Sequence, residues 1–268
     1  MSNGLRESIV DNGDGTATTS WVMNDQMTTY LATVYIGDFE RREYTTDSGL
    51  LIRDYFPPGS ADALEGRFSV TEDIIDFYEE LFGAPYPFEV YGSIVLPFPT
   101  GFALENQTIS VHGIDIVDAG TIAHEIMHQW TGNSVTVAQW QDIWLLEGFA
   151  TYLSFLYFED RDLLGTIEPR GMYAALDRAQ TVGPAEVVIE DLFGLSVYFR
   201  GGMTLHALRV EVGDDTFREI LSEYYRRNEG ERASTQEFLD IVEELGGEAA
   251  VATLDAWLFG SELPPFPE

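Results

Sequence analysis

The stretch HEIMH occupies residues 124–128 of the chain. The segment around it, about 118–131, carries the start and stop signals of a capped helix. Residues four apart lie about 40° apart around a helix axis, so His124 and His128 project from one face and can hold one ion. Glu125 stands beside them, where a carboxylate can act as general base toward an activated water. The stretch therefore predicts a helix that binds a catalytic metal.

The alternative is that these are ordinary polar residues of a helix, since the HExxH pattern alone is only moderately specific. Two of the four histidines in the chain fall in this one stretch. Between them lie Ile126 and Met127, which are apolar and favour a buried helix. Buried histidines need a partner, and this favours the metal interpretation.

A third metal ligand is available at Glu147, which follows His128 after 18 intervening residues. Its surroundings, WLLEGFA at 144–150, are strongly apolar, so an unpaired carboxylate there would be costly. The chain has no cysteine, which restricts metal ligands to histidine and carboxylate. The predicted ligand set is therefore His124, His128 and Glu147, holding one Zn²⁺ per chain with an open position for catalysis.

The charge balance of the chain is strongly acidic. It has 46 acidic residues, 14 arginines and no lysine, which gives a formal net charge of −32 at pH 7. Such a surface repels a phosphate backbone, so nucleic acid is excluded as an expected partner. The acidic residues are spread along the chain, which favours a solvated surface adapted to strong salt over a field that steers cationic substrates.

Length and hydropathy indicate a globular protein. The 268 residues are 45% hydrophobic, which is enough for a large core. No apolar run approaches the 18 residues of a membrane span, and residues 1–9 lack the charged and apolar segments of a signal peptide. We expect a cytoplasmic or secreted protein from a high-salt environment, with its compartment and oligomeric state left open.

The chain divides into two parts in sequence. Alternating apolar and polar residues in 5–55 predict a β-rich stretch, with strands at 8–10, 16–22 and 28–36. The PPGS break at 57–60 then marks a boundary. We therefore predict a first part at 1–58 and a second at 59–268.

Helical spacing dominates the second part. Apolar residues predict a helix over 62–81, and two short strands follow at 89–96 and 103–111. The other predicted helices span about 118–131, 140–158, 169–180, 196–212, 214–228, 234–245 and 248–259.

Two runs around the predicted ligands, HEIMHQWTGN at 124–133 and WLLEGFATY at 144–152, carry a family likeness. With the 18-residue spacer they resemble the aminopeptidase N family of gluzincin zinc metallopeptidases, peptidase family M1, which includes leukotriene hydrolase. The likeness extends from about Trp21 to DAWLFG at 255–260. It implies a thermolysin-like zincin domain of the α+β class, mostly helical with a small sheet, preceded by the last strands of a truncated N-terminal β domain.

The run GFALEN at 101–106 resembles the GxMEN edge-strand motif of that family, with leucine for methionine and Phe102 in place of the first glycine. The resemblance implies that Glu105 binds the free amino group of a peptide, and that Ala103 and Asn106 belong to the same substrate-binding edge. There the strand backbone would pair with an extended peptide. The departure at Phe102 leaves a second interpretation, in which Glu105 is a strand residue facing solvent.

The run YFRG at 198–201 resembles the YxKG segment of the family, with Arg200 replacing lysine. The resemblance implies that the hydroxyl of Tyr198 stabilises the developing oxyanion. His112 and His206 lie outside these motifs, and we interpret both as structural histidines with satisfied hydrogen bonds.

The function that the resemblance implies is zinc-dependent release of N-terminal amino acids from peptides. Two alternatives stay open: a zinc endopeptidase or epoxide hydrolase, and a peptide-binding module that has lost catalysis. In the family a second amine-binding glutamate comes from the N-terminal domain, so peptide hydrolysis is implied more firmly than exopeptidase action. The side-chain preference is not set by the sequence, because the pocket depends on the fold.

Overall fold

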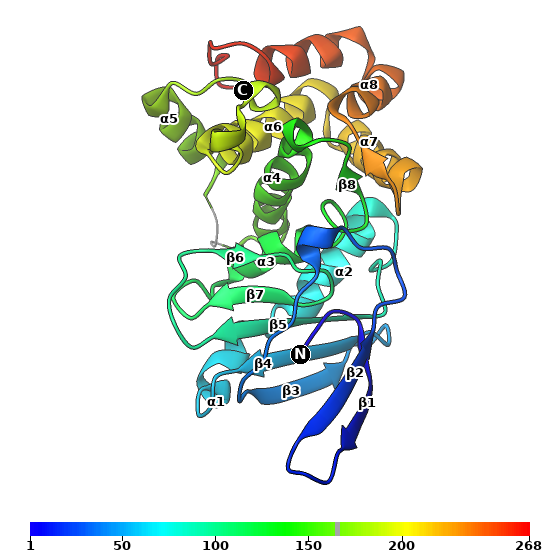
Figure 1. Cartoon of the computed structure of the whole chain (residues 1–268). Helices are drawn as coiled ribbons and strands as arrows, with labels where there is room; N and C mark the ends of the chain where they lie inside the picture. The colour runs from blue at the N-terminus through cyan, green and yellow to red at the C-terminus, as the bar shows by residue number, and fades with distance from the viewer. Residues whose placement is uncertain (164–166) are drawn as a thin grey trace.

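The computed structural model describes residues 1–163 and 167–268. Strands and helices separate along the chain, with a sheet built mainly from the first half and a group of helices built from the second (Figure 1). A large hydrophobic core, which includes Ile52, Trp130 and Phe149, runs through both parts, and a smaller cluster is formed by Tyr55, Ile94, Ile109 and Val111. No helix of the described residues is long and apolar enough to cross a membrane.

The sheet has five strands in the order β3-β4-β5-β7-β6. The pairs β3–β4 and β7–β6 are antiparallel, and the pairs β4–β5 and β5–β7 are parallel. The central strands β4 and β5 are buried along almost their whole length, although β4 contains Arg53 and Asp54. Strand β6 forms one edge, so its outer side is free to pair with another chain. The strands are β3 (Glu40–Thr45), β4 (Leu51–Phe56), β5 (Val90–Leu96), β6 (Ala103–Leu104) and β7 (Ser110–Gly113).

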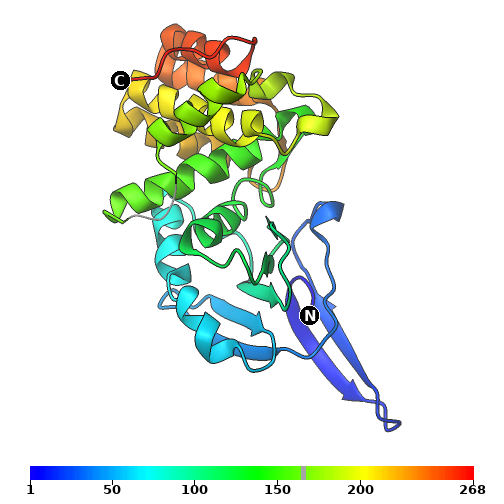
Figure 2. The ribbon, with the colours of Figure 1, turned by 90° about the vertical axis from the view of Figure 1, so that its left-hand side faces the viewer.

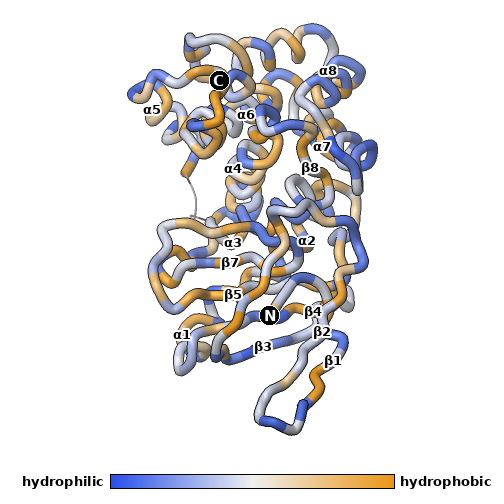
Figure 3. The backbone as a smooth tube through the Cα atoms, viewed as in Figure 1, coloured by the Kyte–Doolittle hydropathy of each residue, from blue (hydrophilic) through white to orange (hydrophobic). Residues whose placement is uncertain are grey.

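Three helices that pack against one another connect the sheet with the helical part. Helix α2 (Thr71–Phe82) contacts α3 (Ala119–Met127), and α3 contacts α4 (Trp144–Asp160). Asp118 caps α3 by accepting a hydrogen bond from the Thr121 amide. Helix α4 is hydrophobic on nearly all sides, as expected for a buried helix. Helix α3 covers one of its flanks and α6 covers another (Figures 1 and 3).

Around this centre lie the shorter elements and the outer helices. The remaining helices are α1 (Ala61–Leu64), α5 (Pro169–Ala179), α6 (Gly201–Val212), α7 (Asp214–Asn228) and α8 (Thr235–Leu258), and the remaining strands are β1 (Leu5–Asp11), β2 (Ala17–Val22), β8 (Thr136–Val137) and β9 (Arg232–Ala233). Strands β1 and β2 form a hairpin that projects away from the rest of the molecule (Figure 2).

A close glycine contact joins α4 to Gly201, the first residue of α6, which directly follows the π-helical turn Ser196–Arg200. A Cβ atom added at Gly148 would lie 2.8 Å from the carbonyl carbon of Gly201, which real Cβ atoms essentially never do. Only glycine lets the two backbones approach so closely. The contact brings the turn that carries Tyr198 against the helix that carries Glu147.

Most predicted elements are confirmed in class, and four need correction. The predicted helix at 62–81 is the short helix α1, a 3₁₀ turn at Glu65–Arg67 and then α2, which begins only at Thr71. The predicted strand at 28–36 is instead a 3₁₀ turn, Thr29–Leu31, followed by an extended segment with one isolated bridge from Ser2 to Val34. The first residues bind this segment through side chains as well as backbone, as in the bond from the Thr33 amide to Asn3 Oδ1. Those contacts replace a regular ladder.

The predicted strand at 103–111 is two antiparallel strands, β6 and β7, joined by a turn. Thr108 in that turn has a φ of 66°, in the left-handed region, and its amide donates to Gln129 Oε1. The predicted helix at 140–158 begins with a 3₁₀ turn, Trp140–Asp142, so α4 itself begins at Trp144.

The predicted helices 234–245 and 248–259 follow one another in α8, which breaks at Gly247 with a φ of 81°. Ser234 and Glu237 form the capping box at the start of that helix. The division at residue 58 stays a prediction. Strand β4, which precedes residue 58, pairs with β5, which follows it.

Candidate active site

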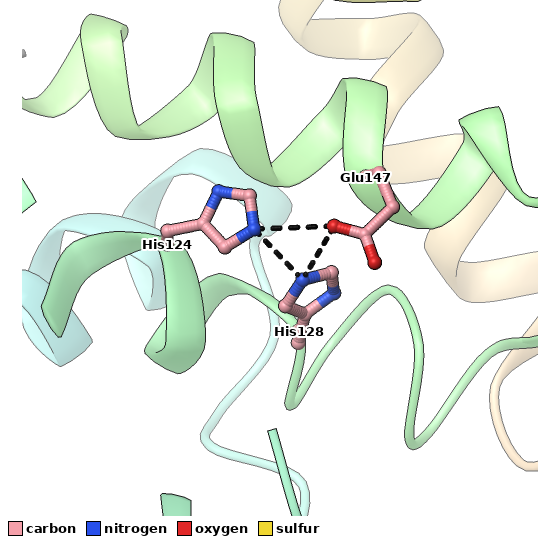
Figure 4. Close-up of side chains that lie close together, drawn as sticks. All are labelled: His124, His128 and Glu147. Atoms are coloured by element: carbon pink, nitrogen blue, oxygen red, sulfur yellow. Dashed lines mark hydrogen bonds and ion pairs between the residues drawn. The ribbon is translucent and has the colours of Figure 1, made fainter. Parts of the chain in front are cut away.

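Three side chains meet between α3 and α4, as the sequence predicts for a metal site (Figure 4). His124 is on α3, His128 caps its C-terminal end, and Glu147 is in the first turn of α4. His124 Nε2 and His128 Nε2 lie 3.2 and 3.3 Å from Glu147 Oε2, and 3.1 Å from each other. His128 and Glu147 are buried, and His124 is half-buried.

The donor set and its geometry fit Zn²⁺. Tetrahedral bonds of about 2.1 Å place neighbouring ligand atoms about 3.4 Å apart, close to the sides of this triangle. His128 Nδ1 lies 3.3 Å from the Thr131 carbonyl oxygen, so the N–H at Nδ1 can donate there and leave Nε2 as the metal ligand. Two histidines and one glutamate leave a tetrahedral ion one open position.

The charges of the three groups also favour a cation. Burial lowers the pKa of His128, but the carboxylate of Glu147 outweighs burial and raises this pKa to about 10. Burial raises the pKa of Glu147, yet the two histidines hold it well below its usual range. The carboxylate therefore stays ionised, and a metal would take the place of the proton on His128.

Glu125 and Tyr198 stand beside the triad. Glu125 is 5% exposed, and burial followed by the charges of Glu105 and Glu147 raises its pKa, against the opposing effect of His128. The ring of Tyr198 is stacked on the ring of His124, with centroids 6.0 Å apart. Burial and the nearby Glu147 charge raise the pKa of Tyr198, so its hydroxyl keeps its proton and can donate.

A pocket of about 450 Å³ opens in front of these groups. Its wall combines the triad, Glu125 and Tyr198 with Ala103 and Glu105 from the sheet edge. The remaining wall residues are mostly aromatic or aliphatic: Tyr30, Phe102, Leu104, Trp140, Ile143, Leu146 and Phe193.

Glu105 faces this pocket and not open solvent, because it is 6% exposed. Its backbone carbonyl accepts hydrogen bonds from Gln129 Nε2 at 3.2 Å and from Asn133 Nδ2 at 2.8 Å. Its carboxylate accepts a hydrogen bond from the hydroxyl of Tyr30 at 2.9 Å. The carboxylate is thus held in place on the side of the pocket formed by the sheet.

The other two predicted substrate-binding residues have different positions. Ala103 lies on β6 and forms part of the pocket wall, next to the free edge of the sheet. Asn106 is buried, and its side chain is bonded to the hydroxyl of Tyr35 and to the carbonyl oxygen of Leu31. The structure therefore shows Asn106 holding the turn after β6 in place.

The two remaining histidines differ from each other. His206 Nδ1 lies 3.1 Å from the hydroxyl of Tyr152, so its predicted structural role is confirmed. For His112 the prediction of satisfied hydrogen bonds is wrong, because neither ring nitrogen has a partner among the described residues. Burial lowers the pKa of His112 to about 4, so the ring is neutral against Phe68.

Sequence reasoning missed the aromatic wall of the pocket. Tyr30, Trp140 and Phe193 come from three turns that are far apart in the chain. No local pattern marks them, since Trp140 lies between two glutamines and Tyr30 follows two threonines. Only the fold brings them to one pocket.

Comparisons with known proteins give a consistent result. Residues 66–257 match the Peptidase family M1 domain. "Aminopeptidase M1-D" of Oryza sativa subsp. japonica is 28% identical over 259 residues, which cover 86% of this chain and 29% of the relative. "Glutamyl aminopeptidase" of Sus scrofa is 27% identical over 260 residues, which cover 86% of this chain and 27% of the relative.

Among solved structures, the chain is similar to an M1 zinc metallopeptidase from Deinococcus radiodurans. The TM-score is 0.92 and the identity 32%, and the match covers 100% of this chain and 62% of that one. A mutant of that enzyme bound to a Tyr-Ser-Ala substrate matches with a TM-score of 0.93. The chain spans less than a third of the length of the curated relatives and less than two thirds of the solved structure.

Proposed function

This chain belongs to peptidase family M1, and we propose on that basis that it is a zinc aminopeptidase, which releases N-terminal amino acids from peptides. One observation carries the proposal. The carboxylate of Glu105, directly after the edge strand β6, and the ligand triad on α3 and α4 line the same pocket of about 450 Å³. A peptide ammonium at the first and a peptide carbonyl at the second would place the first peptide bond for hydrolysis.

The residues of the chain divide the chemistry among them. His124, His128 and Glu147 would hold a Zn²⁺, which would supply Lewis acidity to the reaction. Glu125 accepts the proton of the attacking water and passes it to the leaving amine. The hydroxyl of Tyr198 donates to the oxygen of the tetrahedral intermediate.

The free edge of β6 supports extended binding of the peptide. Ala103 and Leu104 pair with β7 on one side only, because β6 is the last strand of the sheet. A peptide backbone can add there as a further strand, with its amino terminus at Glu105. This would align the chain of the substrate across the pocket.

The direct test measures release of p-nitroaniline from L-leucine and L-phenylalanine p-nitroanilides. We expect wild-type activity to disappear on chelation and to return with Zn²⁺. Glu125→Gln should lower kcat by about 10²- to 10⁴-fold, because it removes the proton acceptor while keeping shape. A matched control is Glu219→Gln, an exposed residue of α7, which should leave the rate unchanged.

Three outcomes would count against the proposal. Activity that survives both metal removal and Glu125→Gln would exclude metal-dependent hydrolysis at this site. Equal cleavage of acetylated and free peptides would show that the enzyme is an endopeptidase and not an aminopeptidase. Stoichiometric zinc binding without turnover would indicate a peptide-binding module.

We further propose that the protein works in strong salt. The support is the net charge of −32 and the absence of lysine. At ionic strengths near 1 M the Debye length is about 3 Å, so repulsion between the carboxylates is largely screened.

A further inference from the structure

A second hollow of about 770 Å³ lies beside the active-site pocket. It is formed by the segments around 25–30, 87–88, 133–140 and 229–232. Tyr30 and Trp140 line both hollows, and they are the two residues common to the two walls. Their ring centroids are 5.5 Å apart with planes at 58°, so the two rings are in contact. The aromatic pair stands between the two spaces.

Tyr30 has a second contact, made by its hydroxyl. It donates to Glu105 Oε1 at 2.9 Å, and it does not bind the second carboxylate oxygen, Oε2. Burial and then the Glu105 charge raise the pKa of Tyr30, so the hydroxyl stays protonated and remains a donor. A charged hydrogen bond of this kind fixes the plane of the carboxylate.

The charge around this end of the pocket suits an ammonium group. Glu105, Glu125 and Glu147 line the pocket, and its wall contains no arginine among the described residues. A peptide ammonium at Glu105 would therefore meet the aromatic pair directly behind it. Any residue added before the first would have to pass through the space that Tyr30 and Trp140 fill.

We propose that Tyr30 and Trp140 form a wall at the amine end of the pocket that restricts cleavage to the first peptide bond, and that Tyr30 is also the positioning residue for Glu105. The inference rests on the proposed aminopeptidase function. It assigns exopeptidase action to a side chain of the segment before residue 58, in addition to Glu105 on the sheet edge. The two roles of Tyr30 can be separated, because one needs the hydroxyl and the other needs the ring.

Tyr30→Phe tests the hydroxyl. It keeps the ring but removes the donor to Glu105, so the ammonium is bound less well in both the ground state and the transition state. KM for L-phenylalanine p-nitroanilide should rise about tenfold, while kcat stays within about twofold. Calorimetric binding of L-phenylalaninamide to the zinc-loaded protein should weaken by the same factor. Tyr173→Phe is the matched control, since that hydroxyl bonds the Pro264 carbonyl oxygen away from the pocket.

Trp140→Ala tests the wall. The side chain is 45% exposed on a short 3₁₀ turn, so its loss should not unfold the protein. Opening the pocket into the second hollow should raise kcat/KM for N-acetyl-alanyl-phenylalanine p-nitroanilide at least tenfold over wild type. The ratio of kcat/KM for the acetylated substrate to kcat/KM for phenylalanine p-nitroanilide should rise by at least the same factor. Phe98→Ala is the control, because Phe98 is 53% exposed and lines neither hollow.

The outcomes separate this inference from the function on which it rests. If wild type releases no amino acid from any free-amine substrate, the proposed function fails and this inference fails with it. If wild type is active but Tyr30→Phe leaves KM and ligand binding unchanged, the positioning role alone is overturned. If Trp140→Ala still rejects the acetylated substrate, the wall is overturned.

Discussion

Asp54 is a buried carboxyl on the central strand β4, and its Oδ1 accepts a hydrogen bond from the Ser93 amide at 2.9 Å. Burial raises the pKa of Asp54 from 3.8 to about 7, although the bond from Ser93 lowers it. The folded protein therefore holds this proton more tightly than the unfolded chain does. Ionisation of Asp54 lowers the free energy of unfolding progressively between about pH 4 and pH 7, and the full cost is present above pH 7.

We expect Asp54→Asn to remove this cost, because asparagine can still accept the Ser93 bond without a charge. The stability gain over wild type should be about 3 kcal/mol larger at pH 8 than at pH 5, measured by urea unfolding. Asp255→Asn, on an exposed part of α8, is the control for loss of one negative charge. A gain that does not vary with pH would show that Asp54 is not the titrating group.

Individual site residues differed in how far the sequence predicted them. His124, His128 and Glu147 could be predicted from spacing and apolar surroundings, because helix geometry is local. Glu105 could be placed only through its likeness to a motif. Tyr30 could not be predicted at all, since its bond to Glu105 joins residues 75 positions apart.

At the scale of elements, the glycine contact between α4 and α6 positions two parts of the site. We expect Gly148→Ala to lower the free energy of unfolding by about 1–3 kcal/mol, because its Cβ would lie 2.8 Å from Gly201 backbone. The same displacement should move Tyr198 away from Glu147 and lower kcat. Thermal melting and p-nitroanilide kinetics would measure the two effects.

Gly66→Ala gives the matched control for that substitution. Nothing lies within 4 Å of a Cβ atom at Gly66, so stability and kcat should both stay close to wild type. If Gly148→Ala behaves like Gly66→Ala, the close approach of α4 and the turn before α6 does not hold the site together.

The helices could be predicted more completely than the strands. Apolar spacing and caps are properties of one segment, and they gave α2 to α8 within a few residues at most ends. The split between β6 and β7 depends instead on Thr108, whose backbone is held by Gln129 and whose hydroxyl accepts from the Gly4 amide. Such contacts between distant segments leave no periodic signal in the sequence.

For the whole molecule, the net charge of −32 predicts that stability depends on salt. Raising KCl from 0.1 M to 2 M shortens the Debye length from about 10 Å to below 3 Å, which relieves repulsion among the carboxylates. We expect the unfolding temperature to rise by about 5–10 °C, measured by calorimetry. Sorbitol of equal osmolality is the control, and a maximum of stability in dilute buffer would contradict salt adaptation.

The overall class of the molecule could be predicted because helical and alternating patterns occupy separate parts of the sequence. The way in which those parts join could not be predicted. Strands on both sides of residue 58 pair in one sheet, and pairing partners are not encoded by the pattern of either strand alone.

The sheet edge and the two helices α3 and α4 together fix the distance between the carboxylate of Glu105 and the ligand triad. Glu105 belongs to the turn after β6, whereas the ligand triad belongs to α3 and α4, so two separately built layers fix the span between them. That span must equal the backbone of one α-amino acid if the proposed reaction occurs. A peptide that begins with a β-amino acid carries one extra backbone carbon, so its ammonium could reach Glu105 while its carbonyl overshoots the triad. Such a peptide would occupy the pocket as a competitive inhibitor.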